Sequence, residues 1–284
     1  MQWLVVSFLL LVAVDAAANS TTAKPHEASG MSAESKHNLV KAHGILMVLA
    51  WLFLVPSAIL FARMLRDAFK HHKPMGLAVW FHVHRTFNVV AILLMAASFF
   101  CVFIATNWKW KGIFSKSKSS TQLHTTCGVV AFALAVAQPF LSLLRCGPTD
   151  PRRPLFNWSH RLIAIVAYIC AMIAFVVAAT EFKKLWTDPV LQTILMVIPG
   201  VLLVVLWPLT QLWLPKDDHV DKKETESFLG RYEAGERLEA SSKYMKEVKK
   251  SYSMRLSVCF WACGMMLATS IAVSLLIAAG YKPK

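Results

Sequence analysis

The chain has 284 residues, of which 56% are hydrophobic and only 16% are charged. Soluble domains carry roughly 45–50% apolar and about 25% charged residues, so this composition excludes an ordinary soluble protein and indicates a membrane protein. The formal charge of +14 could suggest nucleic acid, but basic residues beside apolar spans are explained by membrane topology and lipid headgroups. We therefore expect contact with membrane lipid and no nucleic-acid partner.

The beginning of the chain predicts export. Residues 1–18 are expected to form a signal peptide, because a short apolar run is followed by the small residues Ala16-Ala17-Ala18. An uncleaved anchor stays open, since no basic residue precedes the run. Residues 19–38 are polar and are expected to be a disordered extracytoplasmic lead.

Six apolar segments follow, each with at least the roughly 20 residues that a membrane helix needs. They lie at 39–63, 78–105, 122–145, 158–180, 190–214 and 256–280. The expected fold class is an all-α membrane protein with six transmembrane helices. Most Lys and Arg residues lie in the first, third and fifth connections, which places those connections on the cytoplasmic side. Four lysines in the second connection argue against this orientation: Lys109, Lys111, Lys116 and Lys118.

The longest polar connection spans residues 215–255 and mixes acidic and basic residues. Residues 224–250 are rich in helix formers and mixed charge and are expected to form a solvated cytoplasmic helix. We interpret the connection as a tether between the last two spans, with a partner-binding surface as the alternative. The sixth helix and the tail then occupy residues 256–284.

Four histidines lie near the beginning of the first four spans, one in each: His43, His84, His124 and His160. A histidine inside a bilayer is costly and indicates a functional site. Because neighbouring spans run antiparallel, His43 and His124 fall near the outer face, and His84 and His160 near the inner face. Alternate helices of a four-helix bundle face each other across its core. Each pair could therefore ligate one haem iron from both sides, which leaves no open position for oxygen and favours electron transfer.

Neighbouring residues support this interpretation. Gly44 and Gly128 could admit a flat ring or a close helix contact. Arg85 and Arg161 directly follow the two inner histidines, where haem propionates need cationic partners, although topology alone also explains them. His82 competes with His84, because the two side chains point about 200° apart on a helix. His82 can reach the headgroups, so His84 is the expected ligand.

The segments around these histidines resemble the cytochrome b-561 domain family. Lys41-Ala42-His43-Gly44 is similar to its first core helix, and Trp80-Phe81-His82-Val83-His84 to the Trp-Phe-x-x-His opening of its second. Gln122-Leu123-His124, with Gly128 and Gln138-Pro139, resembles the third helix. Phe156-Asn157-Trp158-Ser159-His160-Arg161 resembles the Asn-Trp-x-His-Arg opening of the fourth. The resemblance is strongest to the membrane part of ferric-chelate reductase 1-like, DOMON-associated proteins.

The resemblance implies a four-helix core with two b-type haems, ligated by His43 with His124 and by His84 with His160. It assigns residues 39–214 to the cytochrome b-561 core plus the fifth helix. It also implies an ascorbate-dependent ferrireductase that passes electrons from cytoplasmic ascorbate to an outer acceptor such as a ferric chelate. The sequence departs from those proteins in showing no reeler or DOMON domain before the membrane part, as in a membrane-only variant or an incomplete gene model.

Several expectations stay open at this stage. Four inner basic residues could attract anionic ascorbate, or could reflect topology alone: Arg63, Arg66, Lys70 and Lys73. The membrane could be the plasma membrane or an endosomal or vesicular one, and a homodimer is open. The first alternative function is a histidine-lined metal or proton transporter, which should place carboxylates beside its histidines at mid-membrane. The second is a non-catalytic membrane scaffold that uses the 215–255 connection.

Overall fold

The computed structural model describes residues 31–66, 69, 73–147, 149–182, 188–212 and 236–280. The predicted signal peptide, most of the predicted lead and Lys70 lie outside this part of the chain, as does the first half of the 215–255 connection. The described residues form helices and no strand. The account below concerns the compact unit that begins at Glu34.

The first membrane helix is continuous but changes its winding. It consists of α2 (Ala33–Val48), a π-helical segment η1 (Leu49–Leu54) and α3 (Val55–Met64). Pro56 lies just after the π segment and has no N–H to continue the regular ladder, so wider turns before it let the helix pass without a break. Because the helix begins at Ala33, residues 33–38 are helical and do not belong to a disordered lead.

Five further helices follow the first one in the described part of the chain. After a short 3-10 turn, η2 (Pro74–Gly76), the chain forms α4 (Val79–Ala105), α5 (Ser119–Leu143), α6 (Arg153–Glu181), α7 (Pro189–Leu212) and α9 (Arg237–Ala279). Five helices of the described chain are long and apolar enough to cross a membrane, and Val190–Leu206 is a shorter apolar helix. These findings confirm the expected all-α multi-pass membrane protein.

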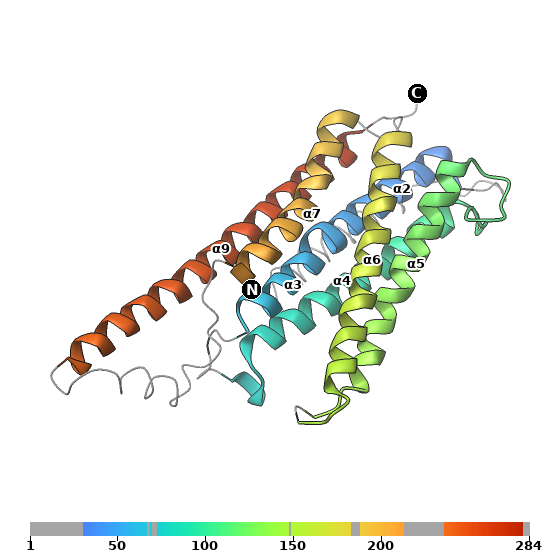
Figure 1. Cartoon of the computed structure of the whole chain (residues 1–284). Helices are drawn as coiled ribbons and strands as arrows, with labels where there is room; N and C mark the ends of the chain where they lie inside the picture. The colour runs from blue at the N-terminus through green and yellow to red at the C-terminus, as the bar shows by residue number, and fades with distance from the viewer. Residues whose placement is uncertain are drawn as a thin grey trace. The chain divides into compact units, whose positions relative to one another are not determined.

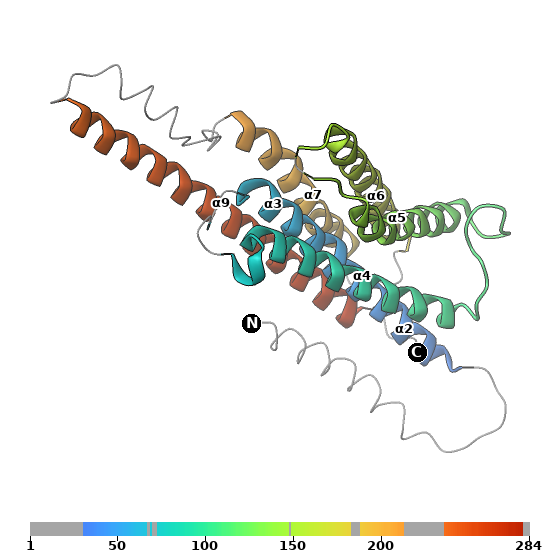
Figure 2. The ribbon, with the colours of Figure 1, turned by 90° about the horizontal axis from the view of Figure 1, so that it is seen from below.

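The apolar core lies between α3, α7 and α9. It contains Leu60, Met64, Leu65, Leu203, Leu206, Cys259, Ala262 and Met266, all at most 8% exposed. By contrast, α5 and α6 run side by side and pack mainly on each other (Figures 1 and 2). Large apolar side chains such as Phe140 and Leu162 are exposed on this pair, as expected for surfaces that face lipid.

The last helix is the longest and includes the second part of the charged connection. α9 begins at Arg237, so residues 237–255 continue directly into the final membrane span. Residues 237–250 of the helix expected at 224–250 are helical, and residues 224–235 lie outside the described part of the chain. The first part of α9 projects past the ends of α3 and α4 (Figures 1 and 2).

Candidate functional site

The four histidines form two pairs of opposed rings. His43 of α2 lies against His124 of α5, with ring centroids 6.2 Å apart and an interplanar angle of 71°. His84 of α4 lies against His160 of α6, with ring centroids 6.3 Å apart and an angle of 62°. Each pair therefore joins alternate helices of the chain.

The spacing of the rings can be compared with that of a metal-bound pair. A bond from a metal to an imidazole nitrogen is about 2 Å, and each ring centre lies roughly 1 Å beyond that nitrogen, so two opposed ligands place their centroids roughly 6 Å apart. Both observed separations have this value. The two pairs thus fit a metal held from both sides.

The second ring nitrogen of three histidines bonds to a main-chain carbonyl. The Nδ1–H groups donate from His43 to Ser98 (3.1 Å), from His84 to Ala58 (3.1 Å) and from His124 to Ala174 (2.9 Å). A neutral imidazole has one N–H, so a donor at Nδ1 leaves the Nε2 lone pair for a ligand. Metal-bound histidines characteristically make such a bond from the other nitrogen, which fixes the tautomer and the ring orientation.

The acceptors of one pair lie on helices that carry the other pair. Ser98 follows His84 by fourteen residues on α4, and Ala174 follows His160 by fourteen residues on α6. Fourteen residues make almost four helical turns, or about 20 Å, and return to nearly the same face. The two histidine pairs therefore lie about 20 Å apart along the bundle.

Two polar side chains on α4 support the histidines and were not predicted from the sequence. The Ser98 hydroxyl is fully buried, lies 2.8 Å from Nδ1 of His43 and donates to the His43 carbonyl (3.0 Å). The Asn88 amide donates to the His84 carbonyl (2.7 Å). Asn88 lies about one turn and Ser98 about four turns after His84 on the same helix. This helical spacing is the sequence signal from which both residues could have been predicted.

A cavity of about 370 Å³ surrounds His43 and His124. We name these two the outer pair, and His84 with His160 the inner pair, after the sides predicted from the sequence. Among the described residues the cavity lining is mostly apolar, contains no acidic side chain and includes Gly128, where a Cβ atom would meet no other atom within 4 Å. Gly44 differs, because a Cβ there would meet Ile277 of α9 at 3.3 Å. Of the two uses expected for these glycines, Gly44 allows a close helix contact and Gly128 leaves open space for a ring.

The outer cavity also has two lysines in its lining. Lys109 and Lys111 come from the connection between α4 and α5. In this connection Asn107 and Trp108 adopt left-handed backbone conformations, with φ of 52° and 58°. These two lysines argued against the membrane orientation predicted from the sequence. They line the same cavity as the rings of the outer pair.

Two aromatic rings lie between the histidine pairs. Trp51 of η1 and Tyr168 of α6 have ring centroids 6.4 Å apart. Trp51 is 4% exposed and also lines the outer cavity. Each residue lies about two helical turns from a histidine of its own helix, so the aromatic pair fills the layer between the two sites.

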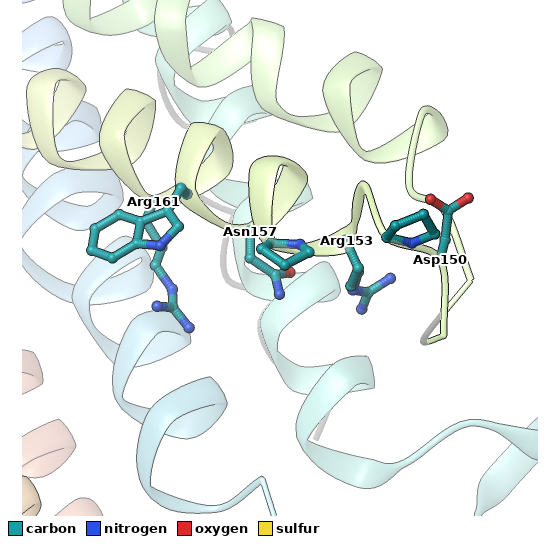
Figure 3. Close-up of a pocket in the computed structure, with 7 residues that line it drawn as sticks. Asp150, Arg153, Asn157 and Arg161 are labelled. Atoms are coloured by element: carbon teal, nitrogen blue, oxygen red, sulfur yellow. The ribbon is translucent and has the colours of Figure 1, made fainter.

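A second pocket, of about 380 Å³, opens at the beginning of α6 (Figure 3), and one of its lining residues, Arg161, directly follows His160. It is lined by Asp150, Pro151, Arg153, Pro154, Asn157, Trp158 and Arg161. The carboxylate of Asp150 forms an ion pair with Arg152 (3.0 Å), whose hydrogen bonds hold the pKa of Asp150 below its ordinary value. Because Arg152 neutralises Asp150, the positive charges of Arg153 and Arg161 in the pocket lining are not cancelled by that carboxylate.

Arginines from several segments meet beside this pocket. Arg85 and Arg145 both lie over the ring of Phe81, at 5.7 and 5.6 Å from its centroid. Burial and the charges of Arg153 and Arg66 lower the pKa of Arg145. Such mutual repulsion shows that the cationic groups are concentrated at this end of the bundle and favours an anionic ligand there.

One of these arginines is linked to an inner histidine through a stacked ring. Arg153 lies over Phe156 (5.7 Å), and Phe156 stacks on His160 with ring centroids 6.0 Å apart. Arg145 and Arg153 had not been singled out in the sequence. They stand next to no histidine in the chain, and only the antiparallel packing of α5 and α6 brings them to this site.

The other predicted residues have different surroundings. His82 binds the carbonyl of Pro74 (2.8 Å), away from the ring of His160. Arg161 lies over Trp158 (5.9 Å). Arg63 and Lys73 are exposed and do not line the inner pocket, while Lys70 is outside the described residues. Among the basic residues expected at a donor site, Arg66 contributes to the positive charge that lowers the pKa of Arg145.

Comparison with known proteins identifies relatives of this chain. The sequence model of the eukaryotic cytochrome b561 family matches residues 42–186. Ferric-chelate reductase 1 of Mus musculus is 35% identical over 48% of this chain and 22% of its own length, and that of Homo sapiens is 34% identical over the same shares. A cytochrome b561 and DOMON domain-containing protein of Arabidopsis thaliana is 30% identical over 51% of this chain and 33% of its own length. No solved structure matches the chain.

Proposed function

Because the chain belongs to the eukaryotic cytochrome b561 family, we propose that it binds two haem b groups and transfers electrons across a membrane. The outer group is assigned to His43 with His124, and the inner group to His84 with His160. The observation that carries this proposal is the presence of two opposed imidazole pairs with metal-compatible separations. A haem fits two-histidine sites because its macrocycle supplies the remaining four ligands.

Bound haem would supply one-electron chemistry, and His43, His124, His84 and His160 would hold the two groups. The protein holds the axial imidazoles in place through the main-chain carbonyls of Ser98, Ala58 and Ala174. Trp51 and Tyr168 pack against each other in the layer between the sites. Gly128 keeps the outer cavity open.

We assign the electron donor to the inner end of the bundle. Arg145, Arg153 and Arg161 concentrate positive charge around the inner pair, which would attract and hold a small anion. Ascorbate is a monoanion at neutral pH and fits this chemistry. It would give up one electron and one proton to become monodehydroascorbate. Arg85 and Arg161 are also assigned to the propionates of the inner haem.

We assign the acceptor to the outer end. Lys109 and Lys111 line the outer cavity, and none of the described residues in its lining is acidic. Two ammonium groups there suit carboxylates, either the haem propionates or an anionic ferric chelate, in which iron(III) would take up one electron to become iron(II). The names of the mouse and human relatives, ferric-chelate reductase 1, support this class of acceptor. The matched segment makes up about a fifth of the length of those two proteins. Ferric-chelate reduction by this chain is therefore a proposal.

The decisive experiment is an absorption spectrum of the purified protein with a pyridine haemochrome count. We expect a b-type α band on reduction and two haems per chain. Vesicles that contain the protein and enclose ascorbate should then reduce an external ferric chelate. A folded protein without colour would overturn the proposal, and a coloured protein that transfers no electrons would leave only haem binding.

A further inference from the structure

His160 is the exception among the four histidines. Its Nδ1 atom is buried and makes no hydrogen bond within the described part of the chain, whereas the other three rings donate to main-chain carbonyls. A buried polar group of this kind needs a partner. The inner haem would therefore have one axial ligand whose orientation no main-chain bond fixes.

Gln138 of α5 has a hydrogen-bond acceptor that is not used. Its Oε1 atom is buried and accepts no hydrogen bond among the described residues. Its Nε2 group already donates to the carbonyl of His160 at 3.0 Å. An unused acceptor and an unused donor thus belong to two residues that are in direct contact.

The register of the helices selects the same residue independently. Ser98 on α4 and Ala174 on α6 serve the opposite histidine pair from positions fourteen residues after His84 and His160. Gln138 follows His124 on α5 by the same fourteen residues. The helix that carries His124 should therefore provide the acceptor for His160 at position 138.

We propose that Gln138 is the positioning residue of the inner haem: its side-chain carbonyl accepts the Nδ1–H of His160 when haem is bound. This inference rests on the proposed haem ligation by His160. Rotation of the amide about the last side-chain bonds would bring Oε1 to the ring. The bond would fix the Nε2 lone pair toward the iron and increase electron donation by the imidazole.

This arrangement would make the inner haem tunable through the side chain at position 138, whereas both rings of the outer pair also donate to the main-chain carbonyls of Ser98 and Ala174. A main-chain carbonyl cannot be exchanged by substitution, whereas position 138 can carry a stronger acceptor or none. A stronger acceptor makes the imidazole more basic, stabilises the ferric state and lowers the midpoint potential. Loss of the acceptor has the opposite effect.

The test is a spectroelectrochemical titration of both haems in the full-length protein and in Gln138→Glu and Gln138→Leu. We expect a lower midpoint potential of the inner haem in Gln138→Glu. In Gln138→Leu we expect a higher inner potential or selective loss of that haem. The outer potential should stay unchanged in both. Gln122→Leu is the matched control, because the Gln122 amide on α5 bonds the carbonyls of Ser115 and Ser117 instead.

The possible outcomes separate this inference from the proposed function. An unaltered inner potential in Gln138→Glu overturns the role of Gln138, even if Gln138→Leu loses haem through poor packing. Equal shifts of both haems also overturn it, since they indicate a global change. A wild-type protein without haem contradicts the proposed function itself, and that result appears before any variant is made.

Discussion

His84 and Ser98 lie on nearly the same face of α4, about four turns apart, and each takes part in a different histidine pair. The ring of His84 faces His160, while the carbonyl and hydroxyl of Ser98 bind His43. The inner and outer sites are therefore built from the same helices, and a helix that carries a ring for one site also carries support for the other.

The pairing of the rings can be tested by deleting single histidines. His43→Ala and His124→Ala should each remove the outer haem, and His84→Ala and His160→Ala the inner haem, because each iron loses one axial ligand. A haemochrome count with potentiometric titration would report which haem is lost. His82→Ala is the control and should keep both haems, since His82 binds the Pro74 carbonyl. If His43 shared a haem with His84, the assignment would be wrong.

Gly128 should be required for haem and not for folding. Gly128→Leu fills open space in the outer cavity, and it replaces a poor helix former by one favoured by roughly 1 kcal/mol. We expect a protein that keeps its helical circular dichroism and lacks the outer haem. Gly264→Leu is the matched control, because Gly264 is also an open helix position but does not line the cavity. Retention of two haems in Gly128→Leu would contradict the assignment of this cavity.

The inner arginines should control the affinity for an anionic donor. Arg145→Gln or Arg153→Gln removes one charge from the cluster, and a loss of about 1 kcal/mol corresponds to roughly a fivefold higher KM for ascorbate. The effect should shrink as salt is added, because salt screens the attraction. Lys246→Gln serves as the control, since Lys246 is an exposed residue of α9 that does not line the pocket. Steady-state reduction at two ionic strengths would check this, and equal KM values in all variants would refute it.

The outer lysines should distinguish acceptors by charge. Lys109→Gln with Lys111→Gln should raise the KM for an anionic ferric chelate severalfold and leave that for a neutral acceptor unchanged. Lys116→Gln, which does not line the cavity, is the comparison. A changed outer midpoint potential with unchanged KM values would instead show that the lysines hold the haem propionates. No effect on either quantity would exclude both roles.

The sequence predicted the features that follow from hydropathy and alternation. The lengths of the apolar segments predicted the membrane helices. The antiparallel order of neighbouring spans predicted which histidine rings would lie close to each other. The helix beginnings were less accurate: polar residues at 33–38 belong to the first helix, and the charged helix that begins at Arg237 continues into the last span without a break. Polar composition does not prevent a helix from extending beyond the membrane, so hydropathy marks the span and not its ends.

The supporting residues were harder to predict because they depend on packing. Ser98 and Asn88 have no motif of their own, and their value comes from contact with His43 and His84. Arg145 and Arg153 act together because the connection between α5 and α6 folds back on itself. The choice between His82 and His84 was different, since helical geometry already required that the two point apart.

The four-turn spacing also bears on how this protein can vary. Adding or deleting one residue between a histidine and the support position on its helix would rotate everything beyond that point by about 100°. On α4, such a change between His84 and Ser98 would turn Ser98 away from His43 while leaving the inner pair in place. Length changes should therefore be confined to the connections, and homologous spans should align without gaps between these positions.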